Sequence, residues 1–289
     1  MGEALRRRRA LVVLAAVAVV ALVVVYAFAV HTHWGQRLDS AAIRGRHVLS
    51  PRDIHVARRI HQIISIASVV LLGSAVCLVA LARRRLRLAV GVGVMMVGAV
   101  LTTEVLKHTL SRPDLGVLDP LRSPSFPSGH TTVAMALSIG AVMVVPIRHR
   151  AAVAILGVVF SATIGCSLII TASHRPSDPI GAALVVTAWA AATAAALLQP
   201  TPRRAADRPW LHLPPYMAIG GVLLLTAAFL VVAAVAIAVE SGRLQTVPVG
   251  RTFAAAGVTI VGTILLCIAV FLLAIGDEDL DRPTSAPRL

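Results

Sequence analysis

The chain has 289 residues, of which 57% are hydrophobic and 14% are charged, and its mean hydropathy is +0.85. Soluble domains carry roughly 25% charged residues, so this composition excludes a soluble globular protein. The formal net charge of +14 does not indicate nucleic-acid binding, because the arginines gather at the ends of apolar segments, where they contact anionic lipid headgroups and set orientation.

Apolar stretches long enough to cross a hydrocarbon core of ~30 Å as helices recur along the whole chain. They span Leu11–Val30, Ile63–Ala82, Leu88–Leu106, Gly129–Ile147, Ala151–Ala172, Ile180–Leu198, Tyr216–Val239 and Phe253–Ile275. The fold class predicted is therefore all-α, a polytopic transmembrane helical bundle. The first stretch resembles a signal peptide, but it is longer than the usual apolar region of about 7–15 residues. We expect it to remain as the first span.

The connections carry further signals. Ser50 to Ile60 predicts a capped interfacial helix that leads into the second span. Residues 201–215 form a Pro- and Arg-rich cytoplasmic linker, residues 216–275 an accessory two-helix unit, and residues 276–289 a disordered tail. Cys77, Cys166 and Cys267 lie far apart within apolar helices. They indicate small core residues and neither a disulfide framework nor a metal site.

The basic residues also predict an orientation. Arg6–Arg9 precede the first span, and Arg83–Arg85 with Arg87 separate the second span from the third. Basic connections favour the cytoplasmic side. We therefore expect the N-terminus inside and Lys107, His130 and His174 on the outer face of the cell membrane.

Three polar clusters fall at the outer ends of the third to sixth spans. Lys107, the only lysine of the chain, ends the third span and is followed by Arg112. Pro127-Ser128-Gly129-His130 opens the fourth span, and His174 and Asp178 lie between the fifth and the sixth. An up-and-down bundle returns these ends to one face, so the clusters are expected to meet.

The residue types favour phosphate chemistry. Gly129 allows close backbone approach, the amides of a helix N-terminus bind anions, and Ser128 adds a hydroxyl. An imidazole such as that of His130 exchanges a proton near neutral pH. Asp178, four residues after His174, can hold one ring nitrogen and leave the other as a nucleophile. Taken alone, each motif also fits a structural role, as a helix cap or a simple hydrogen bond. Glu104 is expected to pair with Lys107.

In this order and on these spans, the residues resemble the type 2 phosphatidic acid phosphatase superfamily, the membrane lipid phosphate phosphatases. The family has three motifs: Lys, six residues, Arg-Pro; Pro-Ser-Gly-His; and Ser-Arg, five residues, His, three residues, Asp. The second motif matches at Pro127–His130, and the third at Ser167, His174 and Asp178. The resemblance implies a six-helix phosphatase-like core over residues 1–200, followed by two further helices.

The resemblance also implies roles for the site residues. His174 would attack phosphorus and become phosphorylated, Asp178 would orient it, and His130 would protonate the leaving oxygen. Lys107, Arg112, Ser128 and Gly129 would hold the phosphate. No metal and no cofactor is implied. The partners are membrane lipids and a lipid or isoprenoid phosphate, with no nucleic acid.

Two departures leave other functions open. Asp114 occupies the usual Arg position of a compressed first motif, and Leu168 replaces the Arg of the third. Arg175, Arg122 or Arg112 is expected to supply the missing guanidinium. The main hypothesis is a phosphatase at the outer leaflet. The alternatives are a phospho-group transferase and a catalytically degenerate lipid-binding or transport protein. The sequence indicates neither the head group of the substrate nor an oligomeric state.

Overall fold

The structure is a computed structural model that describes residues 2–117, 121, 125–198, 221, 225, 248–276 and 280. These residues form helices joined by short connections, and no β-strand occurs among them. The predicted all-α fold is confirmed. The linker at 201–215, the span Tyr216–Val239 and the tail lie outside the described residues, apart from Gly221, Leu225, Gly276 and Leu280.

The described helices follow the predicted spans closely. In chain order they are α1 (Gly2–His31), α2 (His33–Arg44), the 3₁₀ helix η1 (Gly45–Val48), α3 (Pro51–His61), α4 (Ile66–Ala82), α5 (Leu86–Thr109), α6 (Gly129–Val144), α7 (Ile147–Ile170), α8 (Ser177–Leu197) and α10 (Val249–Ile275). Five of these are long and apolar enough to cross a membrane: α1, α5, α7, α8 and α10. Helices α4 and α6 are shorter, with 17 and 16 residues. Helix α6 ends before its predicted limit because Pro146 follows its C-cap residue, Val145.

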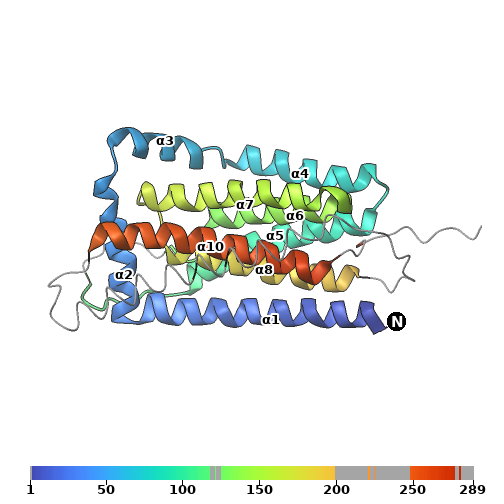
Figure 1. Ribbon diagram of the computed structural model, residues 1–289, viewed down its shortest axis with the longest axis horizontal. Helices are drawn as coiled ribbons and strands as arrows, with labels where there is room; N and C mark the ends of the chain where they lie inside the picture. Colours follow the sequence, from blue (N-terminus) through green and yellow to red (C-terminus); the bar gives the residue numbers. More distant parts are fainter. Residues whose placement is uncertain are drawn as a thin grey trace, which may run out of the picture.

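The long helices lie side by side, and α2 crosses one end of the bundle (Figure 1). Helix α8 is central, since it packs against α1, α5, α6 and α10. Its buried face consists largely of alanines such as Ala182, Ala183, Ala190 and Ala194. Small residues let helices approach closely in a membrane, where packing rather than water exclusion holds them together.

The outer surface is apolar as well. Large aliphatic side chains are exposed along α1, α4, α5 and α7, with Val20, Leu71, Val97 and Leu156 each about 60–70% exposed. In water such a surface would aggregate, whereas in a bilayer it faces lipid. The structure is that of a multi-pass membrane protein.

Helix α10 belongs to the predicted accessory unit, yet it packs directly on the core. It contacts α2, α7 and α8, and residues such as Ile260, Ile264 and Phe271 are fully buried. Helix α10 begins at the same end of the bundle as α8 (Figure 1), where it packs on α2 and η1.

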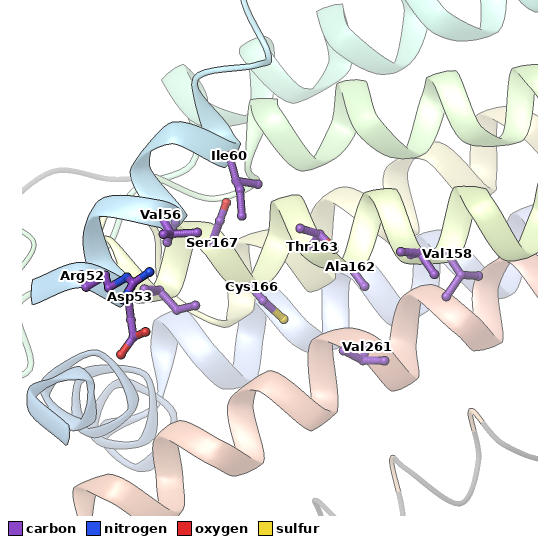
Figure 2. Close-up of a pocket in the computed structure, with 13 residues that line it drawn as sticks. Arg52, Asp53, Val56, Ile60, Val158, Ala162, Thr163, Cys166, Ser167 and Val261 are labelled. Atoms are coloured by element: carbon purple, nitrogen blue, oxygen red, sulfur yellow. The ribbon is translucent and has the colours of Figure 1, made fainter. Parts of the chain in front are cut away.

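The predicted capped helix is present as α3. The Ser50 hydroxyl accepts the Asp53 N–H at 3.2 Å, and the Asp53 carboxylate accepts the Ser50 N–H at 3.0 Å. Helix α3 packs on α7, and the chain continues from it into α4 (Figure 1). A cavity of about 540 Å³ remains between α3, α7 and α10, lined mainly by apolar residues such as Val56, Ile60 and Val261 (Figure 2).

The two ends of the bundle differ. Helix α2 and the starts of α6, α8 and α10 mark one end, which we call the site end. The N-terminus and the turn between α4 and α5, with Arg83–Arg85, lie at the opposite end (Figure 1). There, Arg83 donates to the carbonyl oxygen of Val144 and ties this turn to the C-terminus of α6. The predicted separation of the arginine-rich connections from the polar clusters is thus found in the fold.

Candidate active site

His174 and Asp178 form a hydrogen-bonded pair at the site end. His174 Nδ1 lies 3.0 Å from Asp178 Oδ2. The same oxygen accepts the Ser125 hydroxyl at 2.6 Å and the Arg175 backbone N–H at 2.9 Å. The side chain of Asp178 is 1% exposed and that of His174 is 13% exposed. With Nδ1 held by the carboxylate, Nε2 is the ring nitrogen left for other chemistry.

The end of α7 positions His174. Ala172 has a positive φ of 52°, and the N–H groups of Ser173 and Ala172 donate to the carbonyl oxygens of Leu168 and Ile169 at 2.9 and 3.1 Å. These two hydrogen bonds, together with the left-handed conformation of Ala172, form a Schellman motif, which ends the helix and reverses the chain. His174 follows directly after the reversal.

Pro127-Ser128-Gly129-His130 opens helix α6, as predicted. Ser128 is the N-cap residue, and its side chain accepts the Thr131 N–H at 3.4 Å. Its own N–H donates to the backbone oxygen of Asp178 at 3.1 Å, which joins the second motif to the third. The rings of His130 and His174 are 6.5 Å apart, edge to face. The two imidazoles therefore lie next to each other, one from the start of α6 and the other from the connection before α8.

Lys107 reaches the same helix N-terminus from α5. A Cβ added at Gly129 would stand 3.4 Å from Glu104 Oε1 and 3.6 Å from Lys107 Nζ, so both side chains lie against the first turn of α6. The ammonium pairs with Glu104 Oε1 at 2.8 Å, which confirms the predicted contact. One turn earlier, the hydroxyls of Thr103 and Thr132 lie 2.9 Å apart and fix α5 against α6.

Arg112 lies in the connection after α5, and its side chain is 11% exposed. Its guanidinium Nη1 is 3.8 Å from Asp39 Oδ2 on helix α2. Asp39 in turn accepts the backbone N–H and the hydroxyl of Ser177, at 3.2 and 2.7 Å. Sequence reasoning missed Asp39, because nothing in its local sequence distinguishes it from an ordinary loop carboxylate.

Arg175, which we expected to bind phosphate, is 1% exposed and has partners within the protein. Nη1 donates to the Ser125 hydroxyl at 2.8 Å, and Nη2 donates to the carbonyl oxygen of Leu121. The guanidinium thus holds the segment that precedes Pro127, and through Ser125 it supports Asp178. Ser125 is a second residue that sequence reasoning missed.

Leu168, the other departure from the third motif, belongs to the hydrophobic core. Its side chain is fully buried, and only its carbonyl oxygen takes part in the site, through the Schellman motif. The position therefore supplies no cation. Besides Arg175, the described residues of the predicted phosphate site that carry a positive charge are Lys107 and Arg112.

The fold and the site define a multi-pass helical membrane protein with a paired histidine site at one end of its bundle. Residues 88–202 match the model of the PAP2 superfamily, and this region contains every predicted site residue. The resemblance predicted from the motifs is confirmed over this part of the chain, which runs from α5 through α8.

A solved structure shows the same fold. The chain is similar to the first transmembrane PAP2-type phosphatidylglycerolphosphate phosphatase from Bacillus subtilis, with 21% sequence identity and a TM-score of 0.51. The match covers 62% of this chain and 94% of that protein. A comparison with curated protein sequences finds no significant match.

Proposed function

We propose that this protein is a membrane lipid phosphatase that hydrolyses the phosphate of a lipid or isoprenoid substrate through a phosphohistidine intermediate. The observation that carries the proposal is the His174–Asp178 pair, at 3.0 Å, with the His130 ring 6.5 Å from that of His174. A nucleophile oriented by a carboxylate, with a second acid–base group across a small space, is what phosphoryl transfer in two steps needs.

In the first step, His174 Nε2 attacks phosphorus, so that a P–N bond forms and the P–O bond to the lipid breaks. Asp178 accepts the Nδ1–H and stabilises the positive charge that develops on the ring. His130, in its protonated form, gives its proton to the leaving lipid oxygen. In the second step, the now neutral His130 takes a proton from water, which attacks the phosphohistidine and releases phosphate and His174.

The phosphate oxygens carry negative charge throughout, and the residues at the site can bind them. The ammonium of Lys107, the Ser128 hydroxyl and the backbone amides that begin α6 at Gly129 are the groups that we assign to the phosphate. Arg112 is the guanidinium that we assign to the phosphate. Arg175 is left out of this set because its guanidinium holds Ser125 and Leu121.

An amphiphilic substrate suits a site at the end of a membrane bundle, because its hydrocarbon tail remains in the lipid. The Bacillus subtilis protein of similar fold is a phosphatidylglycerolphosphate phosphatase, which makes phosphorylated glycerolipids the first substrates to test. Hydrolysis by purified protein should be measured over lipid and isoprenoid phosphates, with His174→Ala as the inactive reference. Equal phosphate release by His174→Ala and the wild type would remove the nucleophile assignment.

The acid stability of the phosphorylated enzyme gives an independent test of the His174 nucleophile. A phosphohistidine is lost in acid and survives in base, whereas a phosphoserine shows the reverse. Protein quenched during turnover of a ³²P-labelled substrate should carry label that is lost in acid and absent from His174→Ala.

We also propose that the site faces the outside of the cell, on the grounds that the basic N-terminus and Arg83–Arg87 lie at the opposite end of the bundle. In a background with Cys77, Cys166 and Cys267 replaced by alanine, Asp114→Cys should react with an impermeant thiol reagent on intact cells. His149→Cys, an exposed position at the other end, should be protected. The inverse pattern would reverse the orientation.

A second candidate function is lipid binding or transport without turnover. Leu168 favours it, because the cation expected at that position is replaced by a core side chain. Binding of a lipid phosphate with no phosphate release from any tested substrate would support this function over the phosphatase.

A further inference from the structure

Helix α2 carries two buried polar side chains one turn apart. Gln36 and Asp39 are 4% and 5% exposed, although the helix crosses the end of the bundle. Gln36 Nε2 donates to the carbonyl oxygen of Pro113 at 2.8 Å, and Asp39 Oδ2 lies 3.8 Å from Arg112 Nη1. Both side chains therefore contact the segment of the first motif.

Asp39 also contacts the start of α8. Its two oxygens accept the N–H and the O–H of Ser177, which is the first residue of that helix and the neighbour of Asp178. Asp39 and Ser177 are 138 residues apart in the sequence. The Asp39 carboxylate thus joins Arg112 to the first turn of α8, next to the connection that holds His174.

We propose that Asp39 is a positioning residue for the phosphate site: it fixes the guanidinium of Arg112 relative to the His174–Asp178 pair. The inference rests on the proposed function, in which Arg112 binds phosphate. A carboxylate is costly to bury, whereas an amide that fills the same space costs less. Gln36 shows that α2 can hold the first-motif segment without a charge. The hydrogen bonds from Ser177 and the positive charge of Arg112 favour the charged form of Asp39, and of these two partners Arg112 is the one that carries a charge.

The surroundings make this contact sensitive to pH. Burial, followed by the negative charge of Asp178, raises the pKa of Asp39 to about 7, and Ser177 and Arg112 oppose this shift. The charged and titratable groups that face Asp39 among the described residues are Asp178, with its partner His174, and Arg112. The neighbouring side chains of α1 and α10 are uncharged, for example Phe28, Thr252 and Ala255.

The direction of the pH effect on KM follows from the ionised form of Asp39. Above pH 7 Asp39 is charged and attracts Arg112, and as the pH falls through 7 it becomes neutral and this attraction is lost. Asp39→Asn has no charge at any pH. The variant should therefore differ from the wild type at pH 8 and resemble it at pH 6. The ratio of the two KM values removes any pH dependence that the two proteins share.

Steady-state kinetics of the full chain in detergent micelles test the proposal. At pH 8, Asp39→Asn should raise KM about three- to thirtyfold, within the range found for residues that share a network, and the ratio should approach one at pH 6. In the Arg112→Ala background, Asp39→Asn should add less than about twofold. Asp53→Asn removes a carboxylate from the exposed cap of α3 and should leave KM unchanged.

The proposal is wrong if Asp39→Asn leaves KM at the wild-type value at pH 8, if the KM ratio does not depend on pH, or if the effects of Asp39→Asn and Arg112→Ala multiply in full. Should Asp39→Asn fail to fold, Ser177→Ala takes its place. Because the Ser177 hydrogen bonds lower the pKa of Asp39, their weakening should move the pH dependence of KM to higher pH. An unmoved dependence would overturn the proposal.

Binding of orthophosphate separates this inference from the proposed function. Orthophosphate that binds the folded protein raises its unfolding temperature, and this measurement needs no turnover. If the wild type hydrolyses no lipid phosphate but its phosphate affinity depends on Asp39 as described, the phosphatase assignment fails and the role of Asp39 stands. If the wild type hydrolyses lipid phosphates and Asp39→Asn binds phosphate equally well at pH 8, the role of Asp39 fails alone.

Discussion

Ser125→Ala removes a hydroxyl that connects two charged groups. The hydroxyl donates to Asp178 Oδ2 at 2.6 Å and accepts from Arg175 Nη1 at 2.8 Å. Hydrogen bonds to charged groups contribute about 1.5–3 kcal/mol each. Since both bonds share one oxygen, their loss is not additive, and we expect the free energy of unfolding to fall by about 2–4 kcal/mol.

Activity should fall less than after loss of the nucleophile. Asp178 Oδ2 keeps two of its three described partners, His174 Nδ1 and the Arg175 N–H. Loss of one supporting bond, at about 1.4 kcal/mol, corresponds to roughly tenfold in kcat. KM should change little, because Ser125 is not assigned to the phosphate.

The assay is thermal unfolding in detergent together with phosphate release. Ser173→Ala is the matched control, since Ser173 is exposed and lies in the same connection as His174. If Ser125→Ala behaved like Ser173→Ala in both measurements, the coupling of Arg175 to Asp178 through this hydroxyl would be refuted.

His130→Ala should reduce kcat by ~10²–10⁴-fold on lipid phosphates and much less on an activated aryl phosphate, because a good leaving group needs no proton; equal losses on both substrates would contradict the acid role. Arg112→Ala should raise KM about ten- to a hundredfold through loss of a charged hydrogen bond. Arg175→Ala should instead lower the unfolding temperature, as its guanidinium is buried; a reversed pattern in the two assays would restore Arg175 to the phosphate. Ala172→Gly should stabilise the protein by about 0.5–1 kcal/mol, since glycine adopts the positive φ of 52° at this position without a steric cost. A lower unfolding temperature for Ala172→Gly would count against strain in the Schellman motif.

The sequence predicted the elements whose signals are local. Apolar length located α1, α4 to α8 and α10, and the Ser50–Asp53 spacing predicted the cap of α3. Pro127–His130 marked the start of α6 because glycine and a capping serine favour a helix N-terminus. The pair of His174 and Asp178 was also predictable, since four residues separate the two.

The features that the sequence did not reveal are contacts between distant segments. Arg175 was expected at the phosphate because it adjoins His174, but adjacent residues in a turn can point in different directions. Its partners are 50 or more residues away. Asp39 and Ser125 were missed for the same reason, as their importance depends on Ser177 and Asp178, which the fold alone brings near.

The single lysine of this chain makes the site accessible to spectroscopy. Reductive methylation with ¹³C-formaldehyde modifies primary amines and leaves guanidinium groups untouched, so Lys107 and the N-terminal amine would carry the only labels in a 30.2 kDa protein. The lysine ammonium lies 2.8 Å from Glu104 Oε1, beside the first turn of α6. Its methyl resonance would therefore change when an anion displaces the carboxylate, and would follow occupancy of the site in micelles without resonance assignment of the remaining chain.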